Sequence, residues 1–280
     1  MDDSRGMAGE GADDCSRFSR KVPGCLCMSD DGVRERVETV ALEVPFSVGF
    51  DGVCCDVLSC TPRDLEDLAL GYALSKDVVQ GPDDVAGISI SDLGGCYGAD
   101  VRLREGLSLD PASMRLCPVS GESRSDGAME PLPPYFPARM VHLPAGKPFG
   151  REAVWKAAEG LRERQRMHRD TGATHAAAFV DRRGGFVCVR EDVGRHNAVD
   201  KLIGALLRAG VDPGDGFAYL SSRCALELVN KLARFGVALV ATVSAPTSAV
   251  LDYAVEANVT LAAFARGNRF TVYTHPERIL

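Results

Sequence analysis

The stretch that decides the fold is residues 190–201, which read Arg190-Glu191-Asp192-Val193-Gly194-Arg195-His196-Asn197-Ala198-Val199-Asp200-Lys201. An apolar run at residues 186–189 precedes it, and apolar residues at helical spacing follow it as far as Gly210. The stretch is therefore predicted to be a turn from a strand into a helix. Its polar side chains crowd the N-terminus of that helix, where free backbone N–H groups and the helix dipole favour anions. The alternative is a capped helix with a solvated first turn, although a cap needs only one or two polar residues.

The same strand-to-helix pattern continues toward the C-terminus. Strands are predicted at residues 217–220, 237–243 and 261–265, and helices at residues 222–235 and 246–257 separate them. Such alternation predicts an α/β domain built on a largely parallel sheet. Ligands of these sheets bind at the carboxyl ends of the strands, so we expect the ligand site of this chain at that edge.

Four turns are predicted to meet at this edge. They comprise residues 191–197, 221–224, 244–248 and 266–269. They combine helix N-termini with five cations, which are Arg195, Lys201, Arg223, Arg266 and Arg269. Helix dipoles and fixed cations both favour an anion, so a nucleotide or diphosphate ligand is expected. The chain has no Walker A sequence and no G-x-G-x-x-G, so neither a P-loop nor a Rossmann site is supported.

The N-terminal part of the chain has a different pattern. Residues 1–33 are predicted to form a disordered tail, because they are too polar to bury a core. Residues 34–104 are predicted to form a small mixed α+β domain. Within this domain, Asp51-Gly52 separates two apolar runs and predicts a hairpin turn.

A helix is predicted to start at residue 61. Thr61 stands in the cap position, Pro62 at the first helical position and Asp64 in the place of the capping-box carboxylate. Apolar residues at helical spacing follow, so this helix is expected to carry its own cap.

Residues 105–150 are predicted to be a mobile loop, because they are rich in proline, glycine and serine and show little periodicity. Cys117 lies in this segment, within the sequence Cys117-Pro118-Val119-Ser120-Gly121. A cysteine on an exposed loop can meet a substrate, and its thiolate can react. An incidental loop cysteine is the alternative. Residues 151–280 then form the α/β domain.

Composition excludes several classes of protein. The chain has 280 residues, 45% of them apolar, and a formal net charge of −7, so there is no global attraction to nucleic acid. No apolar run approaches the roughly 20 residues that a membrane-spanning helix needs. The ten cysteines are scattered and form no C-x-x-C pair, which favours a reducing, cytoplasmic location.

His196 and Cys224 are candidates for a zinc site, because each is predicted at a helix start that follows a strand, as in the zinc deaminases. Those sites need H-x-E and P-C-x-x-C sequences, and this chain has neither of them at these positions. Too few ligands remain to hold zinc, so we expect no metal site.

Five segments together resemble the FdhD/NarQ family of formate dehydrogenase accessory sulfurtransferases. These segments are residues 172–178, 190–200, 244–248, 264–267 and the Thr61-Pro62 helix with its sequence at residues 67–71. They are long and keep their order along the chain, so the resemblance is specific, and it extends over about residues 35–280.

The resemblance implies a cytidine-deaminase-like, three-layer C-terminal α/β domain that lacks the deaminase zinc, beside the smaller mixed N-terminal domain. It implies a sulfurtransferase that accepts sulfur from a cysteine desulfurase as a persulfide. The sulfur would go to the bis-molybdopterin guanine dinucleotide molybdenum cofactor, which formate dehydrogenase requires. The anionic guanine nucleotide ends of this cofactor match the ligand expected for the basic edge of the sheet.

The resemblance also carries over site residues. Cys117 would hold the persulfide, whereas the second cysteine of the family's C-x-x-C loop is Ser120 here. The family's nucleotide-binding segment falls on Phe264, Ala265, Arg266, Gly267, Asn268 and Arg269. The helix-start residues Gly194, Arg195, His196 and Asn197 complete the expected cofactor-binding set.

Two functions remain open from the sequence. One is the persulfide sulfurtransferase; the other is a non-catalytic chaperone that binds the molybdenum cofactor and hands it to formate dehydrogenase. The missing second cysteine motivates the second function. Neither function involves nucleic acid or a membrane. A homodimer is the assembly to consider, because cyclic dimers are the commonest oligomers.

Overall fold

The structure is a computed structural model that describes residues 18–29, 32–107 and 140–280. Its N-terminal elements are β1 (Ser19–Cys27), β2 (Val33–Ala41), β3 (Val44–Phe50), β4 (Val53–Cys60), α1 (Leu65–Ser75), η2 (Pro82–Asp84), β5 (Val85–Asp92) and β6 (Tyr97–Leu103). The next elements are α2 (Arg151–Arg164), α3 (Arg166–Thr171), β7 (His175–Asp181), β8 (Phe186–Asp192), α4 (Arg195–Arg208), η3 (Pro213–Asp215) and β9 (Gly216–Leu220). The chain ends with α5 (Leu226–Phe235), β10 (Leu239–Thr242), α6 (Ser248–Glu256), β11 (Thr260–Arg266), β12 (Arg269–Thr274) and η4 (Pro276–Arg278).

The C-terminal part forms a six-stranded sheet in the order β12-β11-β10-β9-β7-β8. Strands β9, β10 and β11 are parallel neighbours, but the other three pairs in the sheet are antiparallel. The expected largely parallel sheet is therefore wrong. The reason is that the chain enters and leaves the sheet through hairpins, β7–β8 and β11–β12, and a short hairpin connects antiparallel strands.

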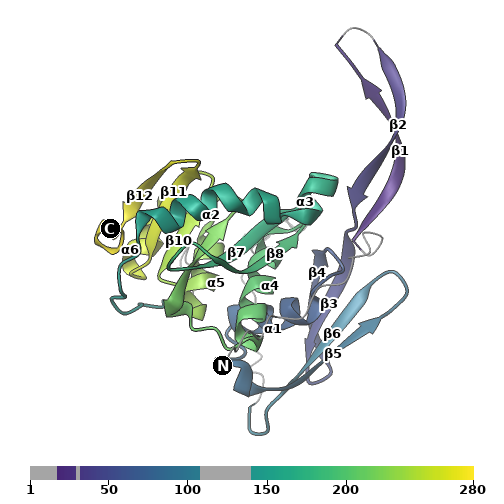
Figure 1. The fold of residues 1–280 in the computed structure, drawn as a ribbon. Helices are drawn as coiled ribbons and strands as arrows, with labels where there is room; N and C mark the ends of the chain where they lie inside the picture. The colour runs from purple at the N-terminus through teal and green to yellow at the C-terminus, as the bar shows by residue number, and fades with distance from the viewer. Residues whose placement is uncertain (1–17, 30–31, 108–139) are drawn as a thin grey trace, which may run out of the picture.

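Helices cover both faces of this sheet, so the domain has three layers (Figure 1). On one face α2 packs against alternate strand residues such as Ala178, Phe217 and Tyr219. The opposite face, with Phe179 and Leu220, packs against α4, α5 and α6. Apolar side chains on both faces explain why its central strands read as continuous apolar runs. The α/β class is thus confirmed, whereas the likeness to cytidine deaminases stays a prediction.

The N-terminal part forms a four-stranded sheet in the order β4-β3-β6-β5, and α1 packs on it. The predicted hairpin turn at Asp51-Gly52 is confirmed between β3 and β4. Its φ angles are 47° and 77°, and positive values at both central residues are typical of a type I′ turn. A mixed α+β unit is therefore present within the residues expected to form one.

The two parts are joined by a very close crossing of α1 and α4. A Cβ atom on Gly71 would lie 1.8 Å from the carbonyl oxygen of Asp200, and one on Gly204 would lie 1.9 Å from that of Asp67. Glycine at both positions lets the two backbones touch. One continuous apolar core extends from the four-stranded sheet through α1 to α4, α5 and α6.

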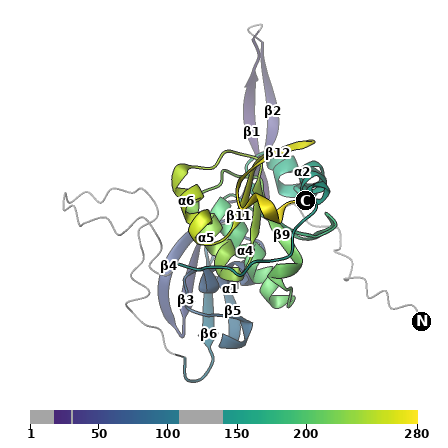
Figure 2. The same cartoon turned by 90° about the vertical axis from the view of Figure 1, so that its left-hand side faces the viewer.

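The N-terminal tail is the main correction to the expected fold. Residues 19–27 form β1, which pairs antiparallel with β2 along its whole length, from Ser19 opposite Ala41 to Cys27 opposite Val33. The resulting ribbon projects away from the rest of the molecule (Figures 1 and 2). Its residues are mostly exposed on both faces, so it lacks the apolar alternation by which a half-buried strand is identified. Residues 1–17 of the predicted tail lie outside the described residues.

The start of α1 also differs from the prediction. The helix begins at Leu65, and its N-cap residue is Asp64, whose φ of 51° is left-handed and whose side chain makes no cap hydrogen bond. The Thr61 hydroxyl instead accepts a hydrogen bond from the backbone N–H of Val193, at 3.2 Å. The predicted cap residue therefore contacts the turn before α4 rather than its own helix.

Of the predicted mobile loop at residues 105–150, residues 108–139 lie outside the described residues. The part that follows them is packed: Leu143 and Phe149 are buried, and the Leu143 N–H donates to the Ala257 carbonyl at 3.0 Å. Phe149 also forms a β-bridge with Ile279. The loop prediction is therefore wrong for this part, where short contacts with the C-terminus replace regular periodicity.

Within the described residues, no helix is long and apolar enough to cross a membrane.

Candidate functional site

The four predicted turns adjoin one another at the carboxyl ends of β8, β9, β10 and β11. The backbone N–H of Ala176 donates to Ser221 Oγ at 2.7 Å, and Thr242 Oγ1 donates to the Ser222 carbonyl at 2.7 Å. The backbone N–H of Phe264 reaches the Ser244 carbonyl at 3.2 Å. These contacts join the turns after β9, β10 and β11 to one another and to the start of β7. The end of β8 lies beside that start, because His175 of β7 pairs with Asp192 of β8. The four turns therefore lie along one edge, as the sequence predicts.

Three helices start at this edge, and none of them has a side-chain cap. The N-cap residues of α4, α5 and α6 are Gly194, Ala225 and Thr247, and no cap hydrogen bond comes from their side chains. The first N–H groups of an uncapped helix need acceptors from outside the helix. The edge therefore presents several free donors together with the positive ends of three helix dipoles.

Arginine side chains from three of the four turns add positive charge. Arg223 and Arg266 are exposed, and Arg266 Nε donates to the Val243 carbonyl at 2.9 Å. Arg195 is half-buried, and its Nε is buried without a hydrogen-bond partner. A buried donor without a partner is rare and calls for an explanation, which an anionic ligand would supply.

Lys201 does not belong to this set, which corrects the sequence prediction. Its side chain has no exposed surface, and its Nζ lies 2.6 Å from Asp192 Oδ2 and 3.0 Å from the Thr61 carbonyl. The helical position of Lys201, two turns into α4, points it into the contact with the N-terminal part. Its charge is neutralised within the protein and is not available to a ligand.

The expected binding segment at residues 264–269 is the hairpin between β11 and β12. Arg266 is paired with Arg269 across a two-residue loop, and Gly267, with a φ of 54°, fits the first central position of a type II′ turn. Phe264 is 43% exposed and also has a left-handed φ of 54°. Left-handed backbone is a strained conformation for a bulky residue, and such strain is concentrated at functional sites.

The residues at the start of α4 divide into two groups. Gly194 and Asn197 contribute to the protein's own structure, since Asn197 Nδ2 donates to the Ser59 carbonyl at 2.7 Å and to Asp192 Oδ1 at 3.0 Å. A Cβ on Gly194 would lie 2.8 Å from Asn197 Nδ2, so a larger residue there would push this amide away from its hydrogen-bond partners. The backbone N–H groups of Arg195 and His196 follow directly and are the first donors of α4.

Two histidines near the edge are held in the neutral form. Burial lowers the pKa of His196 to about 4, and the positive charges of Lys231 and Arg195 act in the same direction. Burial also lowers the pKa of His175, together with the charge of Arg195. His196 Nε2 is buried without a partner. At neutral pH neither imidazole therefore adds positive charge to the edge.

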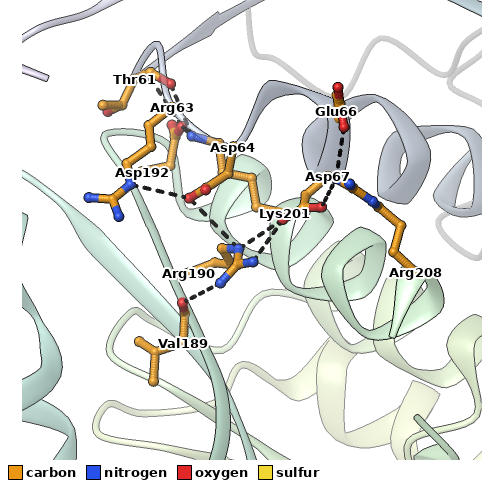
Figure 3. Close-up of polar contacts among 10 residues, drawn as sticks. All are labelled: Thr61, Arg63, Asp64, Glu66, Asp67, Val189, Arg190, Asp192, Lys201 and Arg208. Atoms are coloured by element: carbon orange, nitrogen blue, oxygen red, sulfur yellow. Dashed lines mark hydrogen bonds and ion pairs between the residues drawn. The ribbon is translucent and has the colours of Figure 1, made fainter. Parts of the chain in front are cut away.

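Several carboxylates organise the stretch at residues 190–201, and their partners were not predicted from the sequence. Asp67 of α1 accepts hydrogen bonds from Arg190 of β8 and Arg208 of α4, both at 2.9 Å (Figure 3). Glu191 accepts from the backbone N–H groups of Met167 and His168 at the start of α3. Much of the charge in this stretch therefore binds within the protein. A signal existed, because a carboxylate within an apolar helix stripe, as at Asp67, is rarely buried without a partner.

These site residues lie in a segment with clear relatives. A model of the FdhD/NarQ family matches residues 41–280. The chain belongs to the FdhD/NarQ family. A relative from Bordetella bronchiseptica, named Sulfur carrier protein FdhD, is 39% identical over 249 residues, which cover 86% of this chain and 87% of the relative. A relative of the same name from Chromobacterium violaceum is 41% identical over 258 residues, which cover 88% of this chain and 92% of the relative.

A crystal structure from Desulfotalea psychrophila shares the fold of this FdhD/NarQ chain. It belongs to a protein described as a formate dehydrogenase accessory protein, with a TM-score of 0.75 and 21% sequence identity. The match covers 94% of this chain and 100% of that chain. The similarity extends beyond the family model to the N-terminal part of the chain.

Among the cysteines of this FdhD/NarQ chain, Cys117 lies outside the described residues, so its position relative to the edge stays a prediction. Cys60 and Cys224 are buried, and burial raises the pKa of each thiol to about 12. A thiol with such a pKa is protonated at neutral pH and is a poor nucleophile. Cys224 is therefore a thiol of the apolar core.

Two cavities lie away from the edge. The larger, of about 780 Å³, lies between α1, α4 and β8, and its three arginines face three carboxylates: Arg63, Arg190, Arg208, Asp64, Glu66 and Asp67. The smaller, of about 310 Å³, is lined by Asp77, His142 and Arg234 among others. No group of three or more potential metal ligands is found among the described residues.

Proposed function

We propose that this chain is a sulfur carrier that takes sulfur from a cysteine desulfurase as a Cys117 persulfide and delivers it to a molybdenum cofactor. The cofactor is bis-molybdopterin guanine dinucleotide, and formate dehydrogenase is the enzyme that receives it. The observation that carries the proposal is the edge of the sheet, where three uncapped helix starts lie together with Arg195, Arg223 and Arg266 and supply the positive charge and N–H donors that an anionic ligand needs.

Family membership supports the sulfur chemistry. The relatives at 39% and 41% identity are named sulfur carrier proteins, and the protein with the matching fold is described as a formate dehydrogenase accessory protein. In the loading step, the Cys117 thiolate attacks the outer sulfur of the desulfurase persulfide. The S–S bond of the donor breaks, the donor cysteine leaves as a thiolate, and Cys117 carries the new persulfide. No external oxidant or reductant is needed.

Electrostatics support the guanine dinucleotide ligand. The chain has a formal net charge of −7, so a local basic edge is what would attract a diphosphate to one place. Phe264 is exposed beside Arg266 and offers a ring against which a base or sugar can pack. We place the binding residues at 264–269 and at the start of α4. The larger cavity is a weaker candidate, because its arginines already face carboxylates.

The proposal also includes a cellular location and an assembly state. Persulfide chemistry requires reduced thiols, and no disulfide joins the cysteines within the described residues, so we place the chain in the cytoplasm. A homodimer is the assembly that we consider for it.

The test of loading is a mass measurement on the intact chain after incubation with a cysteine desulfurase and cysteine. We expect the protein to gain the mass of one sulfur atom, and reduction with a thiol should remove it. Cys117→Ala should gain none, whereas Cys224→Ala should gain sulfur like the parent protein, because the buried Cys224 thiol is protonated. Sulfur that persists in Cys117→Ala would contradict the assignment.

The second candidate function is a chaperone that binds and hands over the cofactor without carrying sulfur. Ser120 favours it, because serine cannot act as the second thiol of the family's loop. This function predicts no gain of sulfur but retained binding of guanosine diphosphate, which isothermal titration calorimetry would measure. Replacing Arg266 with alanine should weaken that binding under either function, with Arg182→Ala, in the β7–β8 turn, as a control that leaves it unchanged.

A further inference from the structure

The carboxylate of Asp192, at the end of β8, is buried and accepts four hydrogen bonds. Its Oδ2 accepts hydrogen bonds from the Thr61 backbone N–H at 3.0 Å and from Lys201 Nζ at 2.6 Å. Its Oδ1 accepts from the Gly194 backbone N–H at 2.8 Å and from Asn197 Nδ2 at 3.0 Å. A carboxylate has about four lone-pair sites, so its acceptor capacity is fully used. The side chain has no exposed surface and does not itself reach a ligand.

The contacts of Oδ1 fix the backbone that presents the first donors of α4. Gly194 and Asn197 lie on either side of Arg195 and His196, and both are bound to the same oxygen atom. This arrangement sets where α4 begins. It also holds the backbone on both sides of Arg195, whose Nε is buried without a partner.

The contacts of Oδ2 extend this arrangement to the N-terminal part. Three polar groups of Thr61 bind the turn: its N–H binds Asp192, its carbonyl accepts from Lys201 at 3.0 Å, and its hydroxyl accepts from the Val193 N–H at 3.2 Å. Thr61 is fully buried. The segment between β4 and α1 therefore holds the turn before α4 through three hydrogen bonds.

We propose that Asp192, with its partners Lys201 and Thr61, is the positioning residue of the anion-binding edge. A buried ion pair is weak evidence for stability, because apolar replacements of both partners are often tolerated. What such replacements cannot reproduce is the set of four directed hydrogen bonds that orients the turn. The inference rests on the proposed nucleotide site, and it adds that affinity depends on residues that never touch the ligand.

The experiment measures binding of guanosine diphosphate to the full chain by isothermal titration calorimetry. Replacing Asp192 alone would leave a buried unpaired lysine, so the informative variant removes both charges, Asp192→Asn with Lys201→Met. We expect its thermal midpoint to stay within a few degrees of the parent protein and its affinity to fall at least tenfold. Thr61→Val, which keeps the volume and the charges but removes the hydroxyl, should lower the affinity severalfold.

The matched control is the neighbouring buried pair on α4. Asp200 pairs with Lys231 of α5 and accepts a hydrogen bond from Ser75, but it does not contact the turn before α4. Lys231 is close enough to His196 to lower its pKa, so Asp200→Asn with Lys231→Met can have a small effect on the edge. It should nevertheless lower the affinity for guanosine diphosphate much less than the Asp192 double variant does. An equal loss of affinity in the two double variants would show a general effect of removing a buried ion pair and would overturn the proposal.

A double-mutant cycle with Arg195 separates positioning from a purely structural role. If Asp192 acts by orienting Arg195, then Asp192→Asn with Lys201→Met should weaken binding much less in the Arg195→Ala background than in the parent background. Additive losses would overturn the proposal, as would a double-charge variant that binds normally. Failure of the parent protein to bind guanosine diphosphate would instead refute the nucleotide site itself, and the positioning role would fall with it.

Discussion

His196 shows how a single residue at the site makes stability depend on pH. Burial, with the nearby positive charges of Lys231 and Arg195, lowers its pKa in the folded protein from 6.5 to about 4. The unfolded chain therefore binds more protons than the folded chain between pH 6.5 and 4, and stability rises with pH across that window. The stabilisation from the neutral histidine is complete above pH 6.5 and is lost as the pH falls toward 4.

We predict that lowering the pH from 7 to 5 reduces the free energy of unfolding through His196 by about 2 kcal/mol, at 1.36 kcal/mol per pKa unit. His196→Gln, which keeps a polar side chain of similar size, should remove that part of the pH dependence. Urea unfolding of both proteins at pH 7 and pH 5 measures the difference.

The matched control for this measurement is His142→Gln, because that ring lies exposed at the surface and contacts the Glu256 carbonyl. His142→Gln should show the same pH dependence of the free energy of unfolding as the parent protein. If the free energy of unfolding of His196→Gln falls between pH 7 and pH 5 as much as that of the parent protein, then other groups, such as His175, cause the loss of stability at low pH.

At the scale of elements, the α1–α4 crossing depends on two glycines. Alanine in the middle of a helix usually stabilises it by about 1 kcal/mol relative to glycine. At Gly204, however, a Cβ would lie 1.9 Å from a backbone oxygen of α1, and a backbone atom cannot rotate away as a side chain can. The two helices would have to move apart and would disturb the polar contacts around Asp67 and Asp192.

We therefore predict that Gly204→Ala lowers the free energy of unfolding by about 3 kcal/mol, at the upper end of the usual cost of overpacking. Gly160→Ala in α2 is the control, because its nearest neighbours are ends of side chains at Phe186 and Arg164. The control should stay within about 1 kcal/mol of the parent protein. Denaturant unfolding followed by circular dichroism measures the free energy of unfolding of both variants. An equal loss in Gly204→Ala and Gly160→Ala would disprove the close crossing.

The same elements show what a sequence can and cannot predict. The hairpin at Asp51-Gly52 and the strand-to-helix turns were predictable, because turn residues and apolar periodicity are local properties. The partners of Asp192 were not, since Thr61 lies 131 residues away in the chain and its sequence context fits an ordinary helix cap equally well. The β1–β2 ribbon was missed for a different reason: its exposed faces carry no apolar pattern.

The candidate site could likewise be predicted from the sequence only in part. The meeting of four turns at one edge followed from the order of strands and helices, and the basic residues Arg195, Arg223 and Arg266 were correctly placed there. Lys201 was assigned to the edge because a sequence shows charge but not direction. A lysine two turns into a helix that packs on another helix can point inward, and this one does.

At the scale of the whole molecule, the two predicted domains share one core. Phe46 and Val101 of the four-stranded sheet belong to the same apolar cluster as Leu202 of α4 and Tyr253 of α6. Domains with separate cores can unfold separately, whereas elements that share a core lose their apolar contacts together. The buried ion pair between Asp192 and Lys201 binds Thr61 across the same contact and adds a polar connection to the apolar one.

We therefore predict that the two parts unfold in a single cooperative transition. Residues 18–107 expressed alone should lack stable tertiary structure, because α1 would expose the face that packs on α4 and the four-stranded sheet would lose part of its core. Hydrogen exchange of the full chain tests the first statement: amides of β3 and of β9 should exchange with the same free energy of opening. The NMR spectrum of the fragment tests the second. A well-dispersed spectrum, or β3 amides that open at much lower free energy than β9 amides, would show that the N-terminal part folds independently and that the α1–α4 contact is an interface between domains rather than part of a common core.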